Sequence, residues 1–331
     1  MMNRKYTIPL LALGVGLIAA VAAWLAPGLR PMPIGLLLVG TPPESYSGLI
    51  AVAQAKGYFE DNGLKIALRP YAIGHTALAA LSNKELDVAL ASDFTLATAA
   101  VNGKPYRIVA STALADVSKL VARGDRGIDE PSDLRGKRIA YERDTVLEQH
   151  LATFLQLNGI ELHEVEEVDL DSGYLAEALA EGSVDAAVLR GVVRQDALDR
   201  LGANAREWPA QGGVEFYWVL AARPETLQEK PAEVRSFLRA LLRAEQFLVD
   251  NEAEARRIIA DWTLGSKSPL PAVDEVWFEI ALEQALVLSL EQGAAWRLRG
   301  HGGSDRAPNF LEYIDPAPLL DVAPPTVTLL R

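Results

Sequence analysis

The stretch AVAQAKGYFEDNGLKIALRPY, residues Ala51–Tyr71, joins a helix to a strand through a short turn. Apolar residues recur at helical spacing as far as Lys56, and from Leu64 onward they alternate with polar or small residues, which is typical of a strand. Between the two patterns, Asn62 and Gly63 favour a turn. The stretch therefore predicts a helix–turn–strand unit near the start of the chain.

The same unit recurs on both sides of this stretch. We expect a buried strand over Ile34–Val39, a helix that begins at Thr76 and a strand over Val88–Ala91. Such alternation of strands and helices favours a parallel, doubly wound sheet. A second series of the same kind begins near Ser118. The C-terminal part has helical patterns, among which we count Val273–Leu290.

Two segments of the chain resemble each other. TALAALSNKELDVALAS (residues 76–92) and YLAEALAEGSVDAAVLR (residues 174–190) both read as an Ala/Leu-rich helix, a polar turn and a buried strand, with Asp87 aligned to Asp185. Because the two copies lie in separate series, they indicate two lobes of like design. We interpret Asp87 and Asp185 as turn residues that precede buried strands, not as a pair of catalytic acids.

Composition excludes several classes of protein. The 331 residues suggest about two domains. A formal charge of −12 disfavours nucleic acid as a partner, since phosphates require clustered basic residues. The absence of cysteine excludes disulfides, thiolate metal sites and cysteine nucleophiles, and the four histidines lack metal-ligand spacing. We therefore expect neither a cofactor nor a metal.

The N-terminus predicts export. Arg4 and Lys5 precede an apolar run over Ile8–Ala26, in which Ala20-Val21-Ala22 offers a cleavage site. Residues 1–30 therefore form either a Sec-type signal peptide or an uncleaved N-terminal membrane anchor, because the run is almost long enough to cross a bilayer. In both cases we expect a periplasmic location for the body of the protein.

The blocks GLIAVAQAKGYFEDNGLKIALRP, PSDLRGKRIAYERDT and GSVDAAVLR resemble periplasmic solute-binding proteins of ABC importers for nitrate, sulfonates, taurine and thiamine pyrimidine precursors. The resemblance implies an α/β fold of the type II periplasmic-binding-protein kind, with two doubly wound lobes joined by two crossings. Lobe one would comprise residues 33–112 plus 214–331, and lobe two residues 113–213. It also implies a monomer that is not an enzyme and that docks on ABC permease subunits.

Candidate ligand-binding residues follow from the fold. Ligands of open α/β sheets lie beyond the carboxyl ends of the strands, where helix N-termini offer unpaired N–H groups and partial positive charge. The strand-to-helix junctions and strand ends that qualify contain Ser45, Tyr46, Ser47, Gly74, His75, Thr76, Ser92, Asp93, Thr145, Arg190 and Tyr217.

Each candidate has a structural alternative. Ser47, Ser92 and Thr145 fit helix caps that touch no ligand, and His75 fits a loop that faces solvent. Arg190 could form a surface salt bridge, and it stands in LRGVVR, where relatives often carry an aromatic, acidic or proline cluster. Either Tyr217 or its neighbour Trp218 lines the cleft, because strand alternation sends the other into the core.

The expected function is capture of a small organic anion, sulfonate-like or nitrate-like, with closure of the two lobes around it. Helix ends together with Arg190 suit such a ligand. The alternatives are a planar heterocycle, such as a thiamine pyrimidine precursor stacked on Tyr46 or Tyr217, and a membrane-anchored ligand sensor. An enzyme on the same fold, similar to thiamine-pyrimidine synthases, is disfavoured because their chemistry needs histidine-rich and cysteine-bearing arrangements.

Overall fold

The computed structural model describes residues 35–71, 74–116, 118–143, 145–212, 216–264, 276–301 and 307–330. The strands are β1 (Gly35–Thr41), β2 (Leu64–Pro70), β3 (Val88–Ser92), β4 (Arg107–Ala115), β5 (Lys119–Arg123), β6 (Arg138–Tyr141), β7 (Glu166–Asp169), β8 (Ala186–Leu189), β9 (Ala205–Pro209), β10 (Phe216–Ala222) and β11 (Val276–Ala281).

The helices are α2 (Gly48–Ala55), α3 (Tyr58–Asp61), α4 (Gly74–Ser82), α5 (Asp93–Val101), α6 (Val146–Leu157), α7 (Ser172–Glu181), α8 (Gly191–Leu201), α9 (Pro224–Glu229), α10 (Pro231–Asp250), α11 (Glu252–Leu264), α12 (Gln284–His301) and α13 (Ala317–Leu320). Short 3-10 turns occur as well, the first over Ser45–Ser47. No helix among the described residues combines the length and apolarity that a membrane crossing requires. The expected signal peptide or anchor, residues 1–30, lies outside the described ranges.

The strands form two sheets, of order β11-β4-β10-β3-β1-β2 and β7-β6-β8-β5-β9. Both are mixed, which corrects the expectation of parallel sheets. In the first sheet β1 pairs in parallel with β2 and β3, but β10 runs antiparallel to its neighbours β3 and β4. The reason is connectivity: the chain leaves this sheet at the end of β4 and returns at the start of β10.

The second sheet repeats this plan with β6, β7 and β8 in parallel and β5 antiparallel to both of its neighbours. Residues 35–115 and 216–281 supply the strands of the first sheet, and residues 119–209 supply those of the second. Two crossings between the sheets follow, one after β4 and one after β9. The lobe boundaries expected from the sequence, 33–112 plus 214–331 and 113–213, stay predictions.

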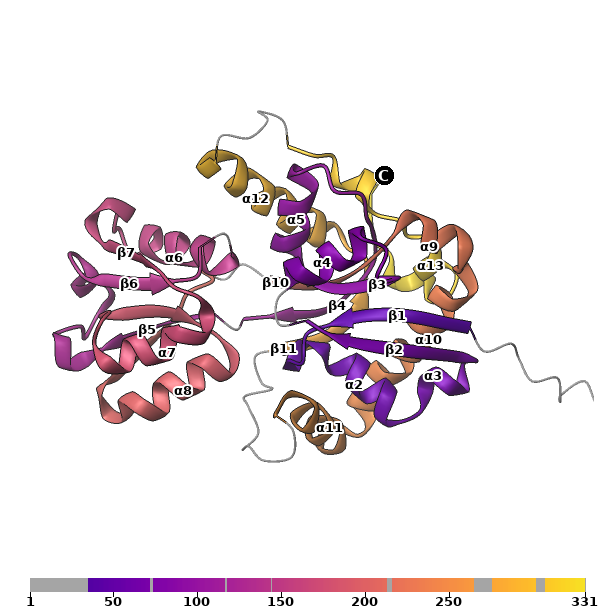
Figure 1. Ribbon diagram of the computed structural model, residues 1–331, viewed down its shortest axis with the longest axis horizontal. Helices are drawn as coiled ribbons and strands as arrows, with labels where there is room; N and C mark the ends of the chain where they lie inside the picture. Colours follow the sequence, from indigo (N-terminus) through magenta and orange to yellow (C-terminus); the bar gives the residue numbers. More distant parts are fainter. Residues whose placement is uncertain are drawn as a thin grey trace, which may run out of the picture. The chain divides into compact units, whose positions relative to one another are not determined.

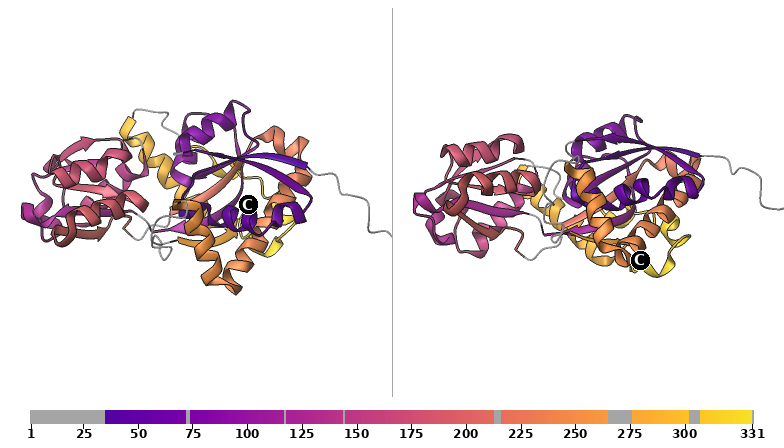
Figure 2. Two further views of the ribbon diagram at one scale, coloured as in Figure 1. Left: turned by 60° about the horizontal axis from the view of Figure 1, so that its bottom comes forward. Right: turned by 90° about the horizontal axis from the view of Figure 1, so that it is seen from below.

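Helices cover both faces of each sheet (Figure 1). On the first sheet, α4 and α5 lie on one face and α2, α10 and α11 on the other. On the second sheet, α6 lies opposite α7 and α8. The C-terminal part packs on the first sheet: α12 lies along α5, and the last residues form bridges from Ile314 to β4 and from Val327 to Leu282 (Figure 2).

The prediction of one helix over Val273–Leu290 was wrong, because strand β11 lies within this range. Residues Val276–Ala281 form an edge strand that pairs antiparallel with β4, and the helix, α12, begins only at Gln284. The apolar residues of the segment VWFEIA suit both the helical and the strand periodicity. Its aromatic and β-branched residues favour a strand once β4 offers an edge to pair with.

The aromatic pair of the opening stretch has a scaffold role. Phe59 is fully buried and its ring stacks on Phe237 of α10 at 5.5 Å between centroids, and Tyr58 meets Phe247 of the same helix edge-on. Both rings therefore pack on α10. The side-chain amide of Asn62 donates to the carbonyl of Tyr58 and holds the turn before β2.

The two aligned aspartates make the same bonds in the two sheets. The Asp87 carboxylate accepts from the amide of Leu38 in β1 at 3.0 Å, and the Asp185 carboxylate accepts from the amide of Arg138 in β6 at 3.0 Å. Their own amides donate back to the carbonyls of the same two residues, at 2.8 and 2.9 Å. The internal repeat is therefore real, and the structural interpretation of both aspartates is confirmed.

Asp87 is the more deeply buried of the two, with 2% of its side chain exposed. Burial by itself would raise the pKa of its carboxyl, but hydrogen bonds from Lys230, the Leu38 amide and Arg223 lower the pKa below its ordinary value. The carboxylate therefore stays ionised and ties the starts of α9 and α10 to β1 and to the start of β3.

We predict that Asp87→Ala lowers the free energy of unfolding by about 3–5 kcal/mol, because it leaves Arg223 and the Leu38 amide without their buried partner. Urea unfolding at neutral pH measures this loss. Asp196→Ala is the matched control: Asp196 pairs with Arg200 on the surface of α8, with about half of each side chain exposed, so its removal costs less than about 1 kcal/mol. Equal losses in the two variants would contradict the assignment.

Candidate functional site

A cavity of about 270 Å³ meets the N-termini of four helices. Its lining includes Gly74, the first residue of α4, and the residues that precede α5, α6 and α8, which are Ser92, Thr145 and Arg190. Two of these helices flank the first sheet and two flank the second. Each N-terminus carries roughly half a positive charge, so the cavity has a positive potential although the protein is acidic overall.

Two glycines allow this arrangement. A Cβ on Gly74 would lie 3.3 Å from the Cβ of Ala91 and 3.5 Å from the Thr95 hydroxyl, so a glycine lets α4 start close against β3. Gly191 has a φ of +53°, which favours glycine, and it makes the sharp turn from β8 into α8. This turn places Arg190 at the wall of the cavity.

The guanidinium of Arg190 forms no hydrogen bond or ion pair with the described residues. It lies 6.0 Å from the centroid of the Trp218 ring. Burial by itself would lower the pKa of Arg190, but Tyr46, Glu44 and Glu142 raise the pKa above its ordinary value. Arg190 is therefore a half-buried, permanently charged donor at the cavity wall. The surface salt bridge weighed as its alternative is absent from the described part of the chain.

Ser92 and Thr95 together offer a hydroxyl donor. Ser92 Oγ caps α5 by accepting from the Thr95 amide at 3.2 Å, and the two hydroxyls are 2.8 Å apart. Only one hydroxyl donates in that contact, so the other keeps its proton for a group in the cavity, which both residues line. Ser92 is thus a helix cap and a cavity residue at once.

Thr145 has no such proton to give. Its hydroxyl donates to the carbonyl of Glu142 at 2.6 Å and accepts from the Leu147 amide at 3.2 Å, so its side chain is fully used in capping α6. Glu142 also lines the cavity, and its carboxylate accepts from the Ser172 hydroxyl. Thr145 can therefore serve a ligand only through the helix end that it positions.

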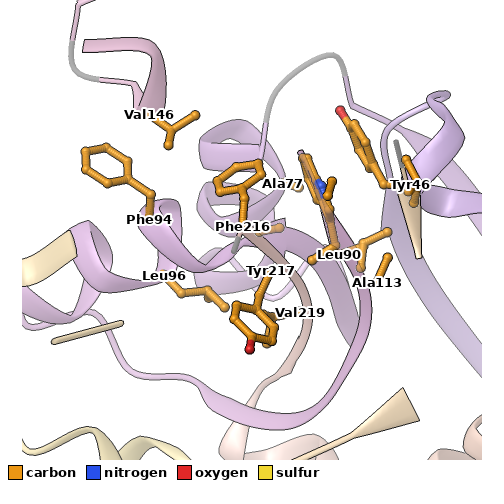
Figure 3. Close-up of a cluster of buried hydrophobic side chains, with 14 of the residues drawn as sticks. Tyr46, Ala77, Leu90, Phe94, Leu96, Ala113, Val146, Phe216, Tyr217 and Val219 are labelled. Carbon is orange, nitrogen blue, oxygen red and sulfur yellow. The ribbon is translucent and has the colours of Figure 1, made fainter. Parts of the chain in front are cut away.

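Trp218, not Tyr217, lines the cavity. Figure 3 shows Phe216 and Tyr217 projecting in opposite directions from β10, with Phe94 and Val146 on the side of Phe216. Trp218 shares that side, since its ring meets Phe216 at 5.6 Å, and both Trp218 and Tyr217 are almost fully buried. The indole N–H of Trp218 is buried without an acceptor in the described ranges.

Most of the remaining candidates lie outside the cavity lining. The Ser47 hydroxyl donates to the Pro42 carbonyl and accepts from Thr41, so it stabilises its own turn. Tyr46 is buried and stacks on Trp218, with centroids 3.3 Å apart, and so supports the indole from behind. Two further candidates are absent from the lining: Ser45, which lies in the same turn as Ser47, and Thr76, which lies on α4. His75 does line the cavity, with an exposed side chain.

Asp93 is buried beside the cavity and not in its lining. Its carboxylate accepts from the amides of Phe94 at 2.7 Å and Tyr217 at 3.2 Å, and from the Ser289 hydroxyl. Burial outweighs these bonds and raises the pKa of Asp93 to about 6. Nearby, burial and then Arg190 lower the pKa of His150 to about 3, so that imidazole is neutral.

The donors and acceptors of the cavity define the ligand chemistry. Two donor groups of the lining have no committed partner among the described residues: the Arg190 guanidinium and one hydroxyl of the Ser92–Thr95 pair. Glu142 is the acidic residue of the lining. No cluster of three or more histidines or acidic residues that could hold a metal occurs among the described residues. The arrangement suits a small group that accepts hydrogen bonds and carries negative charge.

The fold is that of the periplasmic binding proteins. A solved structure, the periplasmic aliphatic sulphonate binding protein SsuA from Escherichia coli, superposes with a TM-score of 0.71 at 15% identity, over 85% of this chain and 92% of that one. The expected α/β class with two lobes and two crossings is therefore confirmed. The chain itself belongs to the NMT1/THI5-like family, whose model matches residues 44–255.

Two curated relatives agree with this membership. A Haemophilus influenzae protein that carries a thiamine-biosynthesis name is 27% identical over 212 residues, which cover 62% of this chain and 66% of that protein. The taurine-binding periplasmic protein of Escherichia coli is 26% identical over 204 residues, which cover 60% of this chain and 63% of that protein. The alignments thus span just under two thirds of both relatives.

We predict that Asp93 makes stability depend on pH. Its native pKa of about 6 exceeds the ordinary value of 3.8, so the native state binds more protons between these two values, and stability falls as the pH rises through that window. Relative to Asp93→Asn, the wild-type protein should lose up to about 3 kcal/mol between pH 4 and pH 7 and then level off. Denaturant unfolding at several pH values measures the difference.

Because both proteins retain His150, its opposing titration cancels in this comparison. Asp261→Asn, which changes an exposed carboxylate on α11, is the control and should follow the wild-type curve. A difference between the wild type and Asp93→Asn that stays constant from pH 4 to pH 7 would show that Asp93 titrates normally.

Proposed function

We propose that this chain is the extracytoplasmic solute-binding protein of an ABC importer, and that it captures a small organic anion of the sulfonate type. The observation that carries the proposal is the cavity in which four helix N-termini and the unpaired Arg190 guanidinium converge, with the Trp218 ring beside the guanidinium. Family membership and the sulphonate- and taurine-binding relatives support the same class of ligand.

A sulfonate matches the donors better than the heterocycle weighed as an alternative. It has acceptor oxygens alone, and a guanidinium can bind two of them side by side. The two rings on which a planar heterocycle would stack are already used: Tyr46 lies against Trp218, and Tyr217 is buried in the core. No specific feature of the described residues favours a pyrimidine ligand.

Capture would work by differential affinity. The residues of the cavity come from both sheets, with Ser92 and Trp218 on the first and Thr145 and Arg190 on the second. A ligand that contacts both groups stabilises the arrangement in which they face each other, and that arrangement then docks on the permease. A periplasmic location, a monomeric state and an N-terminal signal or anchor belong to this proposal.

We expect ethanesulfonate and taurine to raise the melting temperature of the purified protein, because a ligand that binds only the native state stabilises it. In calorimetric titration, Arg190→Gln should weaken binding about ten- to hundredfold, through loss of charged hydrogen bonds. Arg200→Gln, an exposed position at the far end of the same helix, is the control and should bind like the wild type.

Nitrate and a hydroxymethylpyrimidine complete the panel of ligands. Binding of the pyrimidine with no response to any sulfonate would reverse the proposed ligand class. Unchanged sulfonate affinity in Arg190→Gln would remove the cavity from the proposal.

A further inference from the structure

The cavity continues beyond the helix N-termini. Its lining follows the groove between α4 and α5 to the opposite ends of both helices, where Ser82 ends α4 and Asn83 follows it, and where Asn102 and Lys104 follow α5. Helix α4 has nine residues, which at about 1.5 Å of rise per residue gives the groove a length of about 13 Å. A compact inorganic anion at the Arg190 end would leave most of this length empty.

The size of the cavity also exceeds the needs of such an anion. Its volume of about 270 Å³ approaches the ~300 Å³ at which sites for drug-sized organic ligands begin. The volume therefore favours an organic ligand with a substantial substituent.

The wall of the groove changes character along its length. The middle part is mostly apolar, with Leu78 and Ala79 from α4 and Phe94 and Ala99 from α5. The small side chains of Ala79 and Ala99 leave the groove open where larger residues would fill it. Apolar walls of this kind favour an alkyl or aryl chain, since its burial removes apolar surface from water.

A basic side chain stands at the far end of the groove. Lys104 lies at this exposed end, and its ammonium forms no ion pair within the described ranges. An ammonium in this position suits a ligand that carries an acceptor group beyond its anionic head.

We propose that the ligand is an elongated, bifunctional organic anion. Its sulfonate head lies at the four helix N-termini, its chain occupies the groove between α4 and α5, and an acceptor group at its other end meets Lys104. This inference rests on the proposed function and adds to it the shape of the ligand and the residues that select it.

A series of straight-chain sulfonates from ethane- to octanesulfonate, studied by calorimetry on the full chain, tests the proposal. Affinity should rise roughly two- to fourfold for each added methylene as the chain fills the groove. An octanesulfonate with a terminal carboxylate should bind about two- to fivefold more tightly than octanesulfonate, and Lys104→Gln should abolish that preference.

Filling the groove tests the location of the chain. Ala79 is exposed on α4, so Ala79→Trp should fold normally, weaken octanesulfonate at least tenfold and leave ethanesulfonate within about twofold of the wild type. Ala253→Trp, an exposed helical position on α11 away from the cavity, is the matched control and should change neither affinity.

The outcomes separate this inference from the proposed function. Affinity that is independent of chain length, or equal losses for short and long sulfonates in Ala79→Trp, would overturn the groove while leaving the anion site intact. If no sulfonate of any length binds, the proposed function fails and this inference fails with it.

Discussion

The proposed anion site depends on one unpaired charge. Arg190 is half-buried, yet the described residues offer it no hydrogen-bonded carboxylate, and only the more distant Glu44, Glu142 and Tyr46 act on it electrostatically. A guanidinium carries five N–H donors, so an anion that enters the cavity can accept hydrogen bonds that the described residues leave free. The four helix N-termini add to the same field. An acidic protein can therefore present a local anion site with a single basic side chain.

The fold delivers these helix ends because it contains the same construction twice. Asp87 and Asp185 each bond the start of one strand to its parallel neighbour, β3 to β1 and β8 to β6. Parallel strands place all their following helices at one edge of the sheet. Since both sheets contribute two helix N-termini to one cavity, the repeat is the structural basis of the site as well as of the fold.

Local sequence patterns predicted most of this scaffold. Strand–helix alternation and the helix caps at Ser92 and Thr145 depend on neighbouring residues, and the structure contains them. Features that depend on distant partners were missed. Val276–Ala281 became a strand because β4 was free to pair, and Trp218 rather than Tyr217 faces the cavity because the strand's orientation is decided by its neighbours. The uncommitted hydroxyl proton of the Ser92–Thr95 pair follows from the distance between the two side chains, which the sequence does not reveal.

The most direct test is a crystal structure of the protein with 2-bromoethanesulfonate, in which the anomalous signal of bromine fixes the orientation of the ligand. The account predicts that the sulfonate oxygens accept hydrogen bonds from the Arg190 guanidinium and from the Ser92–Thr95 pair, with the bromine directed toward the groove between α4 and α5. A sulfonate bound elsewhere, with Arg190 still unpaired, would contradict it.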